Sequence, residues 1–194
     1  MMRIRAKALG ACTIVAMMSV VANGRASVLE FTDKDDWLVA VGEFNTITFT
    51  EYPDSTFITD QYEALGVLFT DGDDNIACCS DSVFPNDGAG LDGNAAIHLA
   101  FLQPQQWIAA DYPGTIQFEL YYQDQLIHTS EPYGSGIGLF AGLISDEPFD
   151  AAIIFRPFGG VNMSIDDLHF GVPAPAAAWL LGVAALFPAR RRRR

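Results

Sequence analysis

Basic residues are almost absent from the middle of this chain of 194 residues. Of its 11 Lys and Arg residues, only Lys34 and Arg156 lie between residues 27 and 171, whereas all 24 Asp and Glu residues lie there. Two positive charges against 24 negative ones give this stretch a net charge of −22. Phosphates and anionic membranes are bound through Lys and Arg. We therefore expect no nucleic-acid partner, and the acidity predicts either a solvated surface or a site for cations.

Cysteine is scarce as well, with three residues in the whole chain. Cys12 lies in an N-terminal segment that we expect to be removed, which leaves the adjacent pair Cys78 and Cys79. Neighbouring cysteines close only a small strained ring, so a vicinal disulfide, a bridge between two chains and two free thiols all stay open. Without a second cysteine pair we expect no zinc–thiolate site.

The common catalytic signatures are missing. The chain has no Gly-x-Ser-x-Gly elbow, no His-Glu-x-x-His helix and no phosphate-binding glycine loop. Its three histidines, His98, His128 and His169, are scattered over expected strands, and we interpret them as structural or surface residues. No pair among the many carboxylates stands out as the acid and base of a glycosidase. The sequence therefore predicts a protein that is not an enzyme.

The N-terminus has the organisation of a secretory signal peptide. Three basic residues at positions 3 to 7 precede an apolar segment over residues 8–22, and the small residues Gly24 and Ala26 follow it. This order is typical of export signals. We expect cleavage after Ala26, with cleavage after Gly24 as the alternative, and we assign residues 1–26 to the signal.

The C-terminus, residues 172–194, combines a Val-Pro-x-Pro element, an apolar segment and an arginine cluster. The residues that define it are Val172, Pro173, Pro175, Arg190, Arg191 and Arg192. This arrangement resembles the PEP-CTERM sorting signal of bacteria with exopolysaccharide-rich envelopes, which an exosortase recognises. The resemblance implies an exported protein of the cell surface or extracellular matrix. It also implies that the C-terminal segment anchors the protein in the inner membrane only transiently, before processing.

Hydrophobic residues between the two ends alternate with a period of two. Residues 116–123 give the clearest example, with Ile, Phe, Leu and Tyr on one face of a strand and Gln, Glu, Tyr and Gln on the other. Further strands are expected at 45–50, 67–70, 95–101, 125–130, 137–144, 151–156 and 163–170. Only residues 33–41 have a helical pattern, with a short helical turn at 60–65. We predict one all-β domain over residues 27–171, an antiparallel β-sandwich of jelly-roll type with one short N-terminal helix.

Three stretches of this domain, residues 47–49, 58–69 and 165–170, resemble a domain type found with the same sorting signal. The resemblance is to lectin-like and carbohydrate-binding sandwiches, and it implies a calcium ion that joins the chain ends. Asp71, Asp73 and Asp74 form the densest group of oxygen ligands. Asp166 and Asp167 lie on an expected strand, so at most one faces the core, where Arg156 or calcium would balance its charge. The alternative is a pair that faces solvent.

Aromatic rings supply the candidate sugar-binding residues, because sugars stack their apolar faces on exposed rings. Tyr121 is the leading candidate, since the period of two places it on one polar face with Glu119 and Gln123. The other candidates near loops and strand faces are Trp107, Tyr112, Tyr122 and Tyr133, most of which we expect in the core.

Taken with the two end segments, these residues predict an exported, exosortase-sorted β-sandwich that acts without catalysis by binding polysaccharide or cations. Two alternatives stay open, a hydrolase of matrix glycans and a structural coat protein without a specific ligand.

Overall fold

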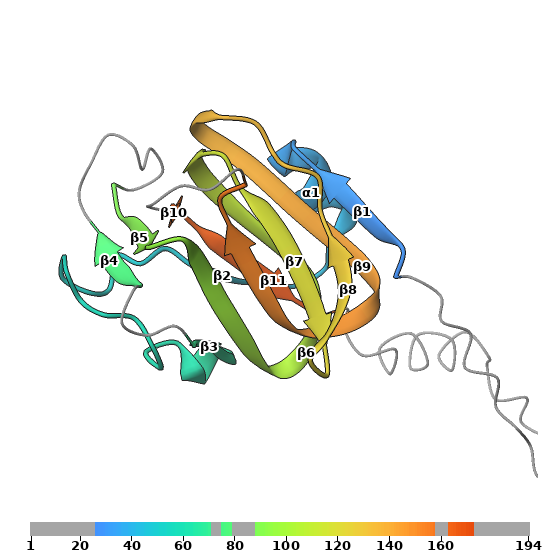
Figure 1. Cartoon of the computed structure of the whole chain (residues 1–194), viewed down its shortest axis with the longest axis horizontal. Helices are drawn as coiled ribbons and strands as arrows, with labels where there is room; N and C mark the ends of the chain where they lie inside the picture. Colours follow the sequence, from blue (N-terminus) through green and yellow to red (C-terminus); the bar gives the residue numbers. More distant parts are fainter. Residues whose placement is uncertain (1–25, 71–74, 79–87, 158–162, 173–194) are drawn as a thin grey trace, which may run out of the picture.

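Two long strands, β6 (Ala96–Gly114) and β9 (Gly136–Phe155), run through the computed structural model of this protein (Figure 1). The structure describes residues 26–70, 75–78, 88–157 and 163–172. The other strands in these ranges are β1 (Val28–Phe31), β2 (Asn45–Ile47), β3 (Val67–Phe69), β4 (Ile76–Cys78), β5 (Gly90–Gly93), β7 (Gln117–Tyr122), β8 (Gln125–Thr129), β10 (Met163–Ile165) and β11 (Leu168–Gly171). The described helices are α1 (Lys34–Ala40) and the short 3-10 helix η1 (Glu63–Leu65).

The strands β6 and β9 pair antiparallel and bend together, so each contributes to two layers. Their register shifts between Ala100 and Gln105. Beyond that point, residues 105–114 of β6 and 136–149 of β9 form a layer in the order β2, β11, β6, β9, β1. We call this the helix-side layer. Before the shift, β6 pairs with residues 151–155 of β9, and this layer has the order β3, β6, β9, β7, β8. We call it the open layer.

The hydrophobic core lies between these two layers. Alternate residues of each strand point inward, as the period of two requires. From the open layer the buried cluster receives Ile97, Leu99, Phe118, Leu120 and Ile154, and from the helix-side layer Ile47, Ile108, Leu143, Leu168 and Phe170. A smaller sheet of β10, β5 and β4 lies at one end of the molecule (Figure 1). The prediction of an antiparallel all-β sandwich is confirmed.

The strand boundaries differ from the sequence-based expectation in a consistent way. Pro104 and Pro148 lie inside β6 and β9, where a proline normally indicates a break, but both lie where the strands bend and their register is irregular. Two expected strands, 137–144 and 151–156, are therefore the two halves of β9. The expected strand 163–170 is divided into β10 and β11, and the expected strand 95–101 continues to Gly114 as β6. The edge strand β1 and the small strands β4 and β5 were not predicted.

The expected N-terminal helix is present as α1. Asp33 caps it, because its carboxylate accepts a hydrogen bond from the backbone N of Asp36 at 3.0 Å. Trp37 is fully buried on the outer face of the helix-side layer. The side chains around it form a second hydrophobic cluster, with Trp107, Ala109 and Phe140 buried and Phe31, Val41 and Ile144 partly buried. The helix thus covers one layer, next to β1 in Figure 1.

Gly171, at the end of β11, lies under Trp107 and leaves no room for a side chain. A Cβ built there would be 2.3 Å from Trp107 Nε1 and 2.7 Å from the backbone O of Glu43. We predict that Gly171→Ala lowers the free energy of unfolding by about 1–3 kcal/mol, measured by urea denaturation, because backbone must move to admit the methyl group. Gly134→Ala is the matched control, since no atom lies within 4 Å of a Cβ built at Gly134. Equal stability of the two variants would contradict this account of Gly171.

Both terminal segments lie largely outside the described residues. Within the ranges that the structure describes, no helix is long and apolar enough to cross a membrane. Val172 is described and exposed. The other expected sorting residues, Pro173, Pro175 and Arg190 to Arg192, lie outside, as do residues 1–25.

Candidate functional site

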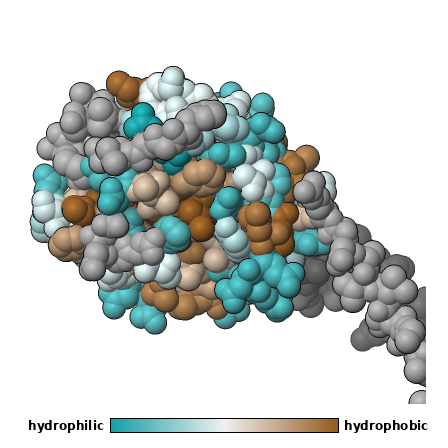
Figure 2. Space-filling view, viewed as in Figure 1, coloured by the Kyte–Doolittle hydropathy of each residue, from teal (hydrophilic) through white to brown (hydrophobic). Residues whose placement is uncertain are grey.

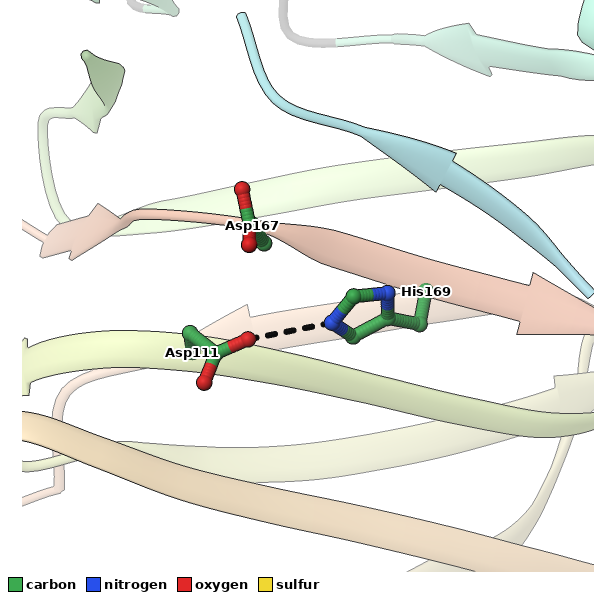
Figure 3. Close-up of side chains that lie close together, drawn as sticks. All are labelled: Asp111, Asp167 and His169. Atoms are coloured by element: carbon green, nitrogen blue, oxygen red, sulfur yellow. Dashed lines mark hydrogen bonds and ion pairs between the residues drawn. The ribbon is translucent and has the colours of Figure 1, made fainter. Parts of the chain in front are cut away.

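A cluster of charged side chains lies between α1 and the outer face of the helix-side layer. Asp111 comes from β6, His169 from β11, Asp167 from the residue before β11, and Lys34 from the first turn of α1. His169 pairs across the strands with Ala109, two residues from Asp111 on the same face of β6. Figure 3 shows the two aspartates and the histidine side by side. We call these four residues the helix-side cluster.

Hydrogen bonds and one longer ion pair connect the side chains of the cluster. The Lys34 ammonium donates to Asp111 Oδ2 at 2.5 Å, and its Nζ lies 3.9 Å from Asp167 Oδ2. His169 Nε2 lies 3.0 Å from the same Asp111 oxygen. On the other side of the ring, His169 Nδ1 lies 2.9 Å from Oγ1 of Thr46, the residue opposite it on β2. One carboxylate oxygen therefore has two partners of potential positive charge.

The cluster is shielded from water. Asp111 is 6 % exposed and His169 is 3 % exposed, and the histidine ring packs against Trp37, Phe44 and Phe140. Burial alone would raise the pKa of the Asp111 carboxyl, but the hydrogen bonds from His169 and Lys34 outweigh it and hold the pKa below its usual range. Asp111 is therefore a buried carboxylate that is held in its ionised form by its neighbours.

The structure tests the expectation for Asp166 and Asp167 directly, because both residues are described. Both are buried, at 0 % and 7 % exposure, so the alternative of a pair that faces solvent is wrong. The pair lies between β10 and β11, where Asp166 N donates to Asp111 O at 2.7 Å and Asp111 N donates to Asp167 O at 3.0 Å. Arg156 was one expected source of positive charge for this pair, but Arg156 is exposed. The Lys34 ammonium is a cation that lies close to Asp167. The other expected calcium ligands, Asp71, Asp73 and Asp74, lie outside the described residues.

Chemically, the cluster offers two carboxylates and one imidazole. One ligand atom from each of Asp111, Asp167 and His169 lies within 4.8 Å of the others, a spacing compatible with a metal ion. Nothing in this arrangement identifies calcium. The same contacts also have a purely structural role, because the ion pairs join α1 to β6 and to the start of β11.

The second candidate site, around Tyr121, lies on the outer face of the open layer. The Tyr121 hydroxyl donates to Glu119 Oε2 at 2.5 Å, and both side chains are partly exposed. This hydrogen bond, with burial and the negative charge of Glu119, raises the pKa of Tyr121 to about 12. The prediction that Gln123 shares this face is wrong. It forms a two-residue turn with Asp124, with φ of 50° and 63°, and its backbone N donates to Asp150.

Register shows which residues share this outer face with Tyr121. Tyr121 pairs with Ala151 and Leu126, and Glu119 pairs with Ile153 and Thr129. The partly or fully exposed side chains that define the face are Leu68, Ala96, His98, Ala100, Gln117, Glu119, Tyr121, Leu126, Thr129, Ala151, Ile153 and Phe155. We call them the open face. Glu119 is its one carboxylate, so the open face is nearly neutral in a domain of net charge −22.

The remaining aromatic candidates are mostly in the interior, as expected. Trp107, Tyr112 and Tyr133 are buried. Tyr133 donates to Glu30 Oε2 at 2.8 Å, while His128 Nε2 lies 3.0 Å from the other oxygen of Glu30, and these contacts join β1 to β8. A cavity of about 340 Å³ opens beside them, lined by Ala26, Leu126, Ile127, His128 and Thr129. The lining includes no residue of the helix-side cluster.

Comparisons of the chain with models of protein families, with curated proteins and with solved structures give no match.

Sequence reasoning found Asp167 but missed its neighbours Asp111, His169 and Lys34. A signal for His169 was present, because residues two apart on a strand share a face and His169 follows Asp167 by two. Asp111 is also a lone acid in the apolar run of residues 107–112. No local signal links Lys34 to either strand, since 77 residues separate it from Asp111.

Proposed function

We propose that this chain is an exported protein that an exosortase sorts to the cell surface or the exopolysaccharide matrix, where its β-sandwich binds polysaccharide without catalysis. The observation that carries the proposal is the open face. α1 packs on the opposite layer, whereas five strands present a sheet surface with partly exposed side chains. Figure 2 shows that apolar side chains reach the surface among hydrophilic ones even in this acidic protein.

The composition of the open face suits a neutral sugar chain. Tyr121 and Phe155 offer rings on which the apolar face of a sugar can stack. Glu119 and Gln117 offer acceptors and donors for hydroxyl groups. A domain of net charge −22 repels an anionic polymer. Neutral polysaccharides are therefore the favoured ligands of the open face.

Tyr121→Ala tests this proposal by removing the ring that lies beside Glu119. We expect retardation of the full-length protein in native gels cast with a neutral polysaccharide, and binding about tenfold weaker in the variant, because truncating an anchoring aromatic side chain costs more than about 1 kcal/mol. Tyr122→Ala is the matched control, since the next residue of the strand points to the opposite face. Circular dichroism checks that both variants are folded.

Three results would contradict the proposal in different ways. Equal retardation of wild type and Tyr121→Ala would mean that the open face does not bind the polysaccharide. Retardation with shortening of the polymer would favour the hydrolase. No retardation on any neutral or anionic polymer would favour a structural coat protein without a specific ligand.

A further inference from the structure

We infer that Asp111, Asp167 and His169 bind a divalent transition-metal ion of the Zn²⁺ type, and that the Lys34 ammonium competes with this ion for the two carboxylates. The inference concerns the helix-side cluster, which lies on the other layer from the open face. It does not depend on polysaccharide binding. Three features support it: the chemistry of the donor atoms, the second hydrogen bond of His169, and the position of Lys34.

The donor atoms fit a small tetrahedral ion. A Zn²⁺ ion with bonds of about 2.0–2.1 Å holds its ligand atoms about 3.4 Å apart. The three donors of Asp111, Asp167 and His169 already lie within 4.8 Å of one another. Asp111 and His169 are on the neighbouring strands β6 and β11, whose register is fixed, and Asp167 directly precedes β11. To bind the ion, the side chains must rotate so that the donor atoms come closer together. An imidazole nitrogen among the donors favours zinc and its neighbours over calcium and magnesium, which prefer oxygen ligands.

Thr46 gives His169 the second contact that metal-binding histidines usually have. Such a histidine donates its other ring N–H to an acceptor, which fixes the orientation and tautomer of the ring. His169 Nδ1 lies 2.9 Å from Thr46 Oγ1, and its Nε2 points at Asp111. A hydroxyl can donate or accept. Thr46 therefore remains a partner of His169 both when Nε2 is protonated and when Nε2 binds a metal.

Lys34 shows that the two carboxylates attract a cation. It is in the first turn of α1, where a positive charge opposes the helix dipole, and yet its ammonium reaches Asp111. The Lys34 side chain is 35 % exposed, so its flexible stem can turn outward to water. A divalent ion then balances the charges of Asp111 and Asp167 without the lysine. The ion and the ammonium exclude each other because both need the same carboxylate oxygens.

The test uses the full-length chain without an affinity tag, with binding of Zn²⁺ measured by titration calorimetry and of Co²⁺ by visible absorption. We expect Lys34→Met to bind both ions at least tenfold more tightly than wild type, because the competing ammonium is gone. Arg156→Met is the matched control, since Arg156 is exposed and is the other basic residue between positions 27 and 171. It removes the same charge from the domain, and we expect a change below twofold.

Two further variants separate this site from ion binding elsewhere on the acidic chain. Lys34→Gln repeats the test with a polar side chain, and Lys34→Met combined with Asp111→Asn removes a ligand, which we expect to abolish the gain. Unchanged affinity in both Lys34 variants would overturn the inference. So would an equal gain in Arg156→Met, or a gain that survives Asp111→Asn. Equal binding of Ca²⁺ by Lys34→Met would overturn the assignment to transition metals.

Discussion

Trp37→Ala is expected to lower the free energy of unfolding by about 3–5 kcal/mol, the range found when a buried Trp or Phe is truncated to Ala. Trp37 is fully buried, and its ring lies 5.3 Å from Phe44, 5.6 Å from Phe140 and 5.8 Å from His169, measured between ring centres. The remaining helix side chains cannot fill this volume. Urea denaturation followed by circular dichroism measures the effect.

The control for Trp37→Ala is Val39→Ala on the same helix. Val39 is 89 % exposed, so its truncation should change the stability by less than about 0.5 kcal/mol. The two variants together separate the packing of α1 on the sheet from the intrinsic stability of the helix. A loss below about 1 kcal/mol in Trp37→Ala would mean that α1 contributes little to the fold.

Local sequence patterns predict the fold class and the helix, but they do not predict how the strands connect the two layers. The alternation at residues 116–123 predicted β7, and Asp33 followed by acidic residues predicted α1. Both signals depend on neighbours in sequence. The bending of β6 and β9 from one layer to the other depends on pairing between distant residues, such as Ile97 with Ile154 and Ile108 with Leu143. Because Pro104 and Pro148 lie at the bends, the sequence predicts shorter, separate strands in place of β6 and β9.

The candidate sites illustrate the same limit. Tyr121 and Glu119 could be placed on one face from their spacing alone, whereas Gln123 could not, because the strand ends at Tyr122. The helix-side cluster brings together an N-terminal helix, the C-terminal part of β6 and the segment that contains β11. Its assembly is a consequence of the sheet order, in which β11 lies beside β6 although 58 residues separate Asp111 from His169.

Asp111→Asn is expected to lower the free energy of unfolding by about 2–3 kcal/mol at pH 7 in the presence of a chelator. Removing one partner of a buried ion pair costs about 3–5 kcal/mol, and the partly exposed Lys34 can regain water, which reduces the loss. The amide keeps the size of the side chain, so the cost reports the lost charge. Asp54→Asn is the control, because Asp54 is exposed and should change the stability by less than about 0.5 kcal/mol.

The pH dependence of this difference follows from the direction of the pKa shift. The pKa of Asp111 is lower in the folded protein than its ordinary value of 3.8. Its carboxylate therefore stabilises the fold above pH 3.8, and this contribution is lost as the pH falls through the folded-state pKa. The gap between wild type and Asp111→Asn, measured by urea denaturation, should show the full contribution of the carboxylate at about pH 5, where it is ionised in both the folded and the unfolded chain. Below pH 3.8 the gap should shrink, and a gap that stays constant there would mean that the ionised carboxylate is not its cause.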